Sequence, residues 1–91
     1  MREFEISEKL KKYLSKISKK DKVRYESAVK KIKEIINSKD VNHYKNLRKP
    51  LQHLKRVHID SSFVLTFEFK EKENILKFID LEHHDKIYKK N

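Results

Sequence analysis

The sequence of 91 residues contains no cysteine and no glycine, and it has a single proline. Without cysteine, neither disulfide bonds nor a thiolate metal site can stabilise the chain, so packing of a modest core must do so. Without glycine, the glycine-rich loops that hold phosphates in nucleotide-binding enzymes are excluded. The length fits one domain, residues 1–91.

Long apolar runs are also missing from the chain. No stretch approaches the roughly 18 apolar residues that a membrane span needs, and the charged segment 1–6 lacks the apolar core of a signal peptide. We therefore expect a cytoplasmic protein with no membrane partner.

Positive charge is abundant, because 24 lysines and arginines against 14 acidic residues give a net charge of +10. The electrostatic field of so many cations favours a polyanionic partner. The candidates are RNA, DNA, an acidic protein and an anionic membrane. The alternative interpretation is a general preference of the organism for lysine and glutamate, for solubility or heat tolerance.

The first half of the chain is patterned as a strand and two helices. Residues 2–6 alternate polar and apolar, as a short edge strand does. Ser7 is a good N-cap, and the apolar residues that follow it have helical spacing at Leu10, Tyr13, Leu14 and Ile17. Asp21 can cap a second helix of roughly 21–38, so we expect an antiparallel helical hairpin.

The second half changes to the period of two that marks strands. After a polar connection at 39–50, strands are predicted at 54–59, 63–69 and 75–81, with short turns between them and a polar tail at 82–91. Short turns make an antiparallel meander. The fold class is therefore α+β, with the order β-α-α-β-β-β and the helical hairpin packed on one face of a curved antiparallel sheet.

Alternation along 54–59 separates an apolar face from a polar one. Val57 and Ile59 should point towards the helices, which leaves Arg56 and His58 on the open face. The first and third strands of a meander run parallel, so the chain leaves the third strand, near His84, at the end of the sheet where Ile59 lies.

Cleavage of RNA without a metal needs a base for the 2′-hydroxyl, charge stabilisation for the phosphorane and an acid for the 5′-oxygen. Histidine titrates in the useful range, cations stabilise the phosphorane, and tyrosine stacks on bases or shuttles a proton. The candidates that supply this set are His58, His84, Arg56, Lys49 and Tyr88.

Several of these features have structural alternatives. His43 and His53 fit isolated surface histidines. The run 83–85 offers possible metal ligands, yet no metal-binding spacing accompanies it, so the sequence assigns no metal and no cofactor. Ile87 and Tyr88 could anchor the C-terminus against the core. The lysines of the helical hairpin either form a solvated face or bind the phosphates of a nucleic-acid backbone.

Four segments resemble the RelE/ParE toxin superfamily, and its YafQ-like branch most closely: Pro50-Leu51-Gln52, Arg56-Val57-His58-Ile59, Phe63-Val64-Leu65-Thr66-Phe67 and Leu81-Glu82-His83-His84-Asp85-Lys86-Ile87-Tyr88. The two helices match only in length and pattern. The resemblance implies a microbial-RNase-like α+β fold. It also implies a type II toxin that cuts mRNA in the decoding site of the ribosome.

Carried over by position, the resemblance makes His58 the strand histidine, His84 the C-terminal histidine and Tyr88 the terminal aromatic, and Arg56 joins them as a catalytic cation. The sequence departs from the branch at three positions. Lys49 replaces a histidine, His53 replaces a glycine, and Ser62 replaces an aspartate for which Asp60 is a possible substitute. RelE-like members work with lysine, arginine and tyrosine instead. The residues predicted to bind RNA phosphates are Lys49, Lys55, Asp60, His83 and Lys86.

The partners implied are an acidic antitoxin, the ribosome and mRNA. An antitoxin of this kind binds as an amphipathic helix or an added strand. Two other functions remain open. One is a non-catalytic binder, directed at DNA gyrase like ParE relatives or retained as a degenerate toxin. The other is a basic nucleic-acid-binding domain, which predicts salt-sensitive binding without cleavage.

Overall fold

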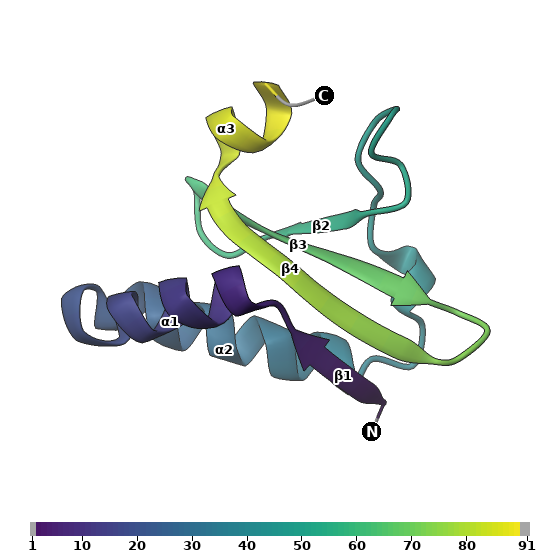
Figure 1. Cartoon of the computed structure of the whole chain (residues 1–91), viewed down its shortest axis with the longest axis horizontal. Coiled ribbons are helices and arrows are strands. Elements are labelled where there is room, and N and C mark those ends of the chain that lie inside the picture. Colours follow the sequence, from purple (N-terminus) through teal and green to yellow (C-terminus); the bar gives the residue numbers. More distant parts are fainter. Residues whose placement is uncertain (1, 90–91) are drawn as a thin grey trace.

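The computed structural model describes the backbone of residues 2–89 and the side chains of residues 2–87. Its elements are β1 (Glu3–Ile6), α1 (Glu8–Lys20), α2 (Lys22–Ile36), the 3-10 helix η1 (Val41–His43), β2 (Lys55–His58), β3 (Phe63–Lys70), β4 (Ile75–His83) and α3 (His84–Lys89). Helices α1 and α2 lie together on one side of the sheet, and α3 rises on the other side (Figure 1). The α+β fold class is confirmed.

Both predicted helix caps form. The Ser7 hydroxyl accepts a hydrogen bond from the amide of Leu10, and the Asp21 carboxylate accepts one from the amide of Arg24. Helix α2 ends at Ile36, two residues before the predicted boundary. Within residues 2–89, no helix has both the length and the apolar character required to cross a membrane.

The sheet has the strand order β1-β4-β3-β2. Strands β2, β3 and β4 form the predicted antiparallel meander. Strand β1 pairs with β4 in parallel, from Glu3 opposite Ile75 to Ile6 opposite Phe78. The expectation of a purely antiparallel sheet was therefore wrong. Residues 2–6 show the alternation of a strand, but alternation carries no information about the direction of its partner.

The main core lies between the helical hairpin and the sheet. Its fully buried side chains include Leu10, Ile35, Leu65, Phe67 and Phe78. The partly buried Val57 and Ile59 pack against this cluster, which confirms that they face the helices.

A second, smaller cluster covers part of the opposite face of the sheet. Val64 of β3, Ile87 of α3 and Leu47 of the η1–β2 connection form it, with Leu51 and Leu54 packed around them. Since α3 and the connection rise on the same side of the sheet (Figure 1), this cluster fixes both of them over the open face.

Candidate active site

The end of β2 places His58 on the open face of the sheet. His58 lies opposite Val64 on β3, and Val64 lies opposite Glu82 on β4. Side chains at paired positions point to the same face. Because Val64 packs against Ile87, this is the face that α3 covers. His58 itself is exposed, so its imidazole is accessible to a bound nucleic acid.

Arg56 places a cation beside this histidine, two residues earlier on β2. Arg56 lies opposite Thr66, which in turn lies opposite Asp80. Arg56 and His58 are two residues apart on one strand, so both project to the open face as predicted. Arg56 is half-buried, whereas Thr66 and Asp80 are buried.

His84 begins α3 at the same end of the sheet. Its amide donates to the carbonyl of Ser62 (2.8 Å), in the turn that joins β2 to β3, and the Ile59 amide donates to the Phe63 carbonyl (2.9 Å) across that turn. His58 and the end of β4 are separated by one intervening strand, about 10 Å at the usual strand spacing. The two histidines therefore lie at the same end of the sheet.

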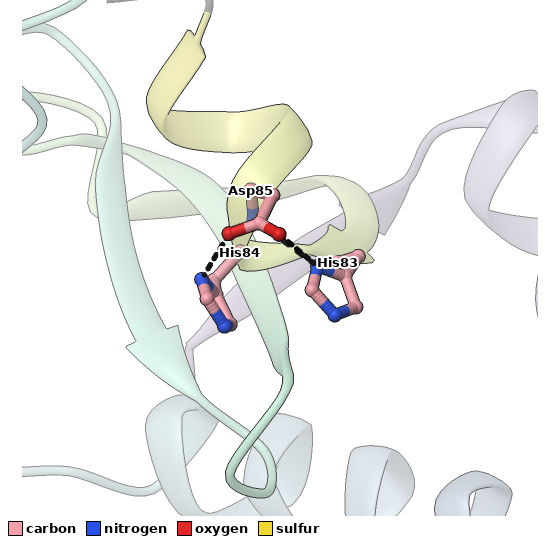
Figure 2. A group of neighbouring side chains, drawn as sticks. All are labelled: His83, His84 and Asp85. Carbon is pink, nitrogen blue, oxygen red and sulfur yellow. Dashed lines mark hydrogen bonds and ion pairs between the residues drawn. The ribbon is translucent and has the colours of Figure 1, made fainter.

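Three consecutive side chains, His83, His84 and Asp85, converge where β4 becomes α3 (Figure 2). The two imidazoles are stacked with their centroids 4.6 Å apart. The Asp85 carboxylate lies 3.0 Å from His84 Nδ1 and 3.7 Å from His83 Nδ1. A neutral His84 that donates from Nδ1 to this carboxylate keeps Nε2 as the proton acceptor.

Asp60, a predicted phosphate-binding residue, has a structural role in the β2–β3 turn. Its Oδ1 accepts hydrogen bonds from the amides of Ser62 and Phe63 (both 2.8 Å), and its Oδ2 lies 3.4 Å from Arg24 Nε. Partial burial alone would raise the pKa of Asp60, but the two amides and the guanidinium outweigh it and hold the pKa below its usual value. A carboxylate stabilised in its ionised form does not serve as a proton donor.

Lys55, also predicted to bind phosphate, is buried on the helix side of the sheet. Its ammonium donates to the Tyr44 carbonyl (3.1 Å) and to Asn46 Oδ1 (3.2 Å), and the residue is 7% exposed. A buried ammonium with two acceptors from the chain holds the η1–β2 connection in place. This placement contradicts the phosphate-binding prediction for Lys55.

The other predicted residues occupy the rim of this region. Lys49 is exposed in the η1–β2 connection, Lys86 is exposed on α3, and His83 is partly exposed at the end of β4. The backbone of α3 includes position 88, but the side chain of Tyr88 lies outside the described residues.

Sequence reasoning missed an ionic cluster at the free edge of β4. Lys9 of α1 lies 2.9 Å from Asp80 Oδ2 and 3.1 Å from Glu82 Oε1. Burial, together with the neighbouring Glu82, raises the pKa of Asp80, and the hydrogen bond to Asp80 raises the pKa of Lys9. Alternation along β4, which puts both carboxylates on one face, was the available signal.

This cluster forms one wall of a groove of about 470 Å³ between α1 and the β4–α3 junction. The aromatic side chains of Tyr13 and Phe63 line it together with His83 and Lys86. The Arg24 guanidinium lies over the Phe63 ring, 3.7 Å from its centroid. The groove therefore combines aromatic surface with cationic groups beside the histidines.

Comparison with known proteins supplies the family. No family model matches the sequence. The chain is 50% identical over 90 residues to a protein of Methanocaldococcus jannaschii named "Putative toxin RelE4", and the alignment covers 99% of this chain and 94% of that relative. The chain belongs to the RelE family of toxins. It is accordingly the toxin of a toxin–antitoxin system, and toxins of this family are generally ribonucleases.

Solved structures share this RelE-type fold. The YoeB/ParE toxin from Agrobacterium tumefaciens matches with a TM-score of 0.76 at 10% identity, over 90% of this chain and 98% of that one. YafQ from E. coli matches with a TM-score of 0.67 at 15% identity, over 97% and 99%. A toxin from Helicobacter pylori, described as metal-bound, matches with a TM-score of 0.70 at 24% identity, over 96% and 99%.

Two further matches with the RelE-type fold are toxins crystallised with their antitoxins, the E. coli RelBE and DinJ–YafQ complexes. The resemblance to the RelE/ParE superfamily, read from residues 50–88, is thus confirmed.

Proposed function

We propose that this toxin is an endoribonuclease that cuts mRNA on the ribosome, without a metal in the chemical step. The observation that carries the proposal is the grouping of Arg56 and His58 on the open face with His84 fixed at the same end of the sheet. The membership of a toxin family whose members are generally ribonucleases supports it.

The chemistry is an in-line transesterification. One histidine removes the 2′-hydroxyl proton, and the 2′-oxygen attacks the adjacent phosphorus. The bond from phosphorus to the 5′-oxygen breaks, and the second histidine protonates that oxygen. The products are a 2′,3′-cyclic phosphate and a 5′-hydroxyl. His58 and His84 fill these two roles, in either order.

Cationic groups stabilise the additional negative charge of the phosphorane. Arg56 lies on the same strand face as His58, so its guanidinium can donate to the non-bridging oxygens. Lys49, His83 and Lys86 contact flanking phosphates from the rim. Tyr88 stacks on a neighbouring base or relays a proton.

Ribosome dependence follows from the separation of the groups. His58 and the start of α3 are separated by one intervening strand, so the two histidines need a substrate held in the reactive conformation. Ribosomal RNA is polyanionic, and the net charge of +10 favours docking to it. An acidic antitoxin is complementary to the same charge and would block either the open face or entry to the ribosome.

The test is cell-free translation with purified protein, followed by primer extension to map breaks in the mRNA. His84→Ala and His58→Ala should each reduce cleavage at least about 100-fold, as loss of an acid–base group does. His43→Ala is the matched control. His43 is an exposed histidine of η1 whose ring centroid lies 4.0 Å from that of Tyr44, and its loss should leave cleavage unchanged.

Wild-type protein that arrests translation without breaking mRNA would overturn the ribonuclease proposal. A non-catalytic binder, as in the gyrase-directed ParE type, would then be the better explanation. Equal loss of cleavage in His43→Ala and His84→Ala would instead show that the site has been misplaced.

A further inference from the structure

The junction of β4 and α3 has a second chemical property besides acid–base catalysis. His83, His84 and Asp85 each offer one ligand atom, and these atoms all lie within 4.8 Å of one another. We propose that these three residues bind a divalent transition-metal ion of the Zn²⁺ class. The sequence alone assigned no metal, because the run matches no metal-binding spacing, and it is the fold that makes the side chains converge.

The backbone explains this convergence. Alternation in a strand would send His83 and His84 to opposite faces, but β4 ends at His83 and α3 begins at His84. The change from strand to helix turns the two rings to the same side, where they stack at an interplanar angle of 29°. The Asp85 amide donates to His83 Nδ1 (3.2 Å) and tightens the turn, a hydrogen bond that a metal ion on this nitrogen would replace.

The ligand atoms already approach coordination distances. In a tetrahedral zinc site, bonds of about 2.1 Å place neighbouring ligand atoms about 3.4 Å apart. Asp85 Oδ1 lies 3.0 Å from His84 Nδ1 and Asp85 Oδ2 lies 3.7 Å from His83 Nδ1, so the carboxylate points between the two rings (Figure 2). The one ligand atom that each residue offers lies within 4.8 Å of the other two, and the set must tighten to hold an ion. Both histidine side chains are more than a third exposed, so small rotations about χ1 and χ2 can bring the three ligand atoms to coordination distances.

Two imidazoles and one carboxylate select the class of ion. Zn²⁺, Cu²⁺ and Ni²⁺ prefer imidazole ligands, whereas Mg²⁺ and Ca²⁺ prefer oxygen. Three protein ligands leave at least one coordination position for water, as in open zinc sites. The ion would lie at the margin of the groove that Glu82, His83 and Lys86 line.

Occupation of this site inhibits the toxin. This consequence rests on the proposed function, because His84 is one of the two acid–base groups there. Coordination through His84 Nδ1 fixes the proton on Nε2, so this ring can no longer accept a proton from the RNA, and without the imidazolium form it is a much weaker acid. The ion and catalysis therefore compete for the same imidazole. The metal is therefore a reversible inhibitor of cleavage, and antitoxin is not needed for this inhibition.

Isothermal titration of ZnCl₂ into the full-length protein, without an affinity tag, tests the site in the absence of RNA. Saturable binding of one ion per chain is expected. His84→Gln and Asp85→Asn should each weaken the affinity at least about 10-fold. His43→Gln, the matched control, should bind as tightly as wild type, because His43 lies in η1 beside Tyr44. Circular dichroism of each variant shows that it is folded.

Three outcomes would overturn the metal site: no saturable binding of Zn²⁺, equal affinity in wild type and His84→Gln, or loss of binding in His43→Gln. Cleavage assays with and without Zn²⁺ then address the inhibition separately. Metal binding in a protein that shows no ribonuclease activity would support the site and reject the proposed function. Full cleavage at saturating Zn²⁺ would reject the inhibition alone.

Discussion

The two faces of the sheet differ in what they bury. On the helix side, Leu65, Phe67 and Phe78 are fully buried beneath α1 and α2. On the open side, Val64 is the one β3 residue that anchors a cluster, and its partners Ile87 and Leu47 come from α3 and a connection. Alternate residues of the same strands thus serve stability on one face and the candidate site on the other.

The difference teaches where substitutions should act. A residue facing the helices is surrounded by the main core, so its truncation leaves a cavity that the rigid hairpin cannot fill. A residue on the open face contacts only a short helix and a connection, which can adjust. Stability should therefore respond mainly to the first face, and cleavage mainly to the second.

The largest expected effect is the loss of folding stability when the core on the helix side is truncated. Phe67 is fully buried between the rings of Tyr44 and Phe78, with centroids 5.7 and 5.8 Å away. Phe67→Ala should destabilise the protein by about 3–5 kcal/mol, measured by urea denaturation. Phe4→Ala is the matched control, because Phe4 is 44% exposed and should cost less than about 1 kcal/mol. A loss below about 1 kcal/mol in Phe67→Ala would contradict the assignment of the main core.

A smaller loss of stability with a larger loss of activity is expected on the open face. Ile87 is 5% exposed and packs against Val64, which fixes α3 and hence His84. Ile87→Ala should cost about 2 kcal/mol, at the low end for such truncations. Cleavage should fall at least about 10-fold, because displacement of a catalytic group is costly.

Val23→Ala serves as the control for Ile87→Ala, since Val23 is 78% exposed on α2. It should change neither the urea midpoint nor cleavage. If Ile87→Ala lost stability but cleaved mRNA normally, α3 would not position the site, and the two faces would not divide stability and function as inferred.

Sequence periodicity was sufficient to separate the two faces, because alternation depends only on local backbone geometry. It placed Val57 on the helix side and His58 on the open side correctly. It could not give the parallel pairing of β1 with β4, since that pairing is decided by where the helical hairpin returns the chain.

The site itself was harder to predict, because burial depends on tertiary contacts. Lys55 looked like a surface cation in the sequence, but the η1–β2 connection supplies Tyr44 and Asn46 as acceptors and buries its ammonium. Asp80 and Lys9, distant in the sequence, form an ion pair only because α1 begins beside the free edge of β4. The positions of His58 and His84 as acid–base groups stay a prediction.

The smallest expected effect concerns Asp60, in the turn between β2 and β3. The pKa of Asp60 is lower in the folded protein than its unfolded value of about 3.9. The unfolded chain therefore binds more protons in this range, so stability from Asp60 is complete above about pH 4 and is lost as pH falls through the folded pKa. Asp60→Asn should flatten the decline of stability measured by urea denaturation between pH 5 and pH 2.

Measurements at high salt are the control for the comparison of wild type with Asp60→Asn. The Asp60 side chain is 37% exposed, and part of its stabilisation is the ion pair with Arg24, which solvent screens. The difference between wild type and Asp60→Asn should therefore shrink in about 1 M salt, where the Debye length is about 3 Å. The part that survives reports the additional strength that an ionised acceptor gives the two amide hydrogen bonds, because the amide oxygen of the Asp60→Asn variant can still accept both. A difference that grew with salt, or that appeared only above pH 5, would show that Asp60 is not held in its ionised form by these partners.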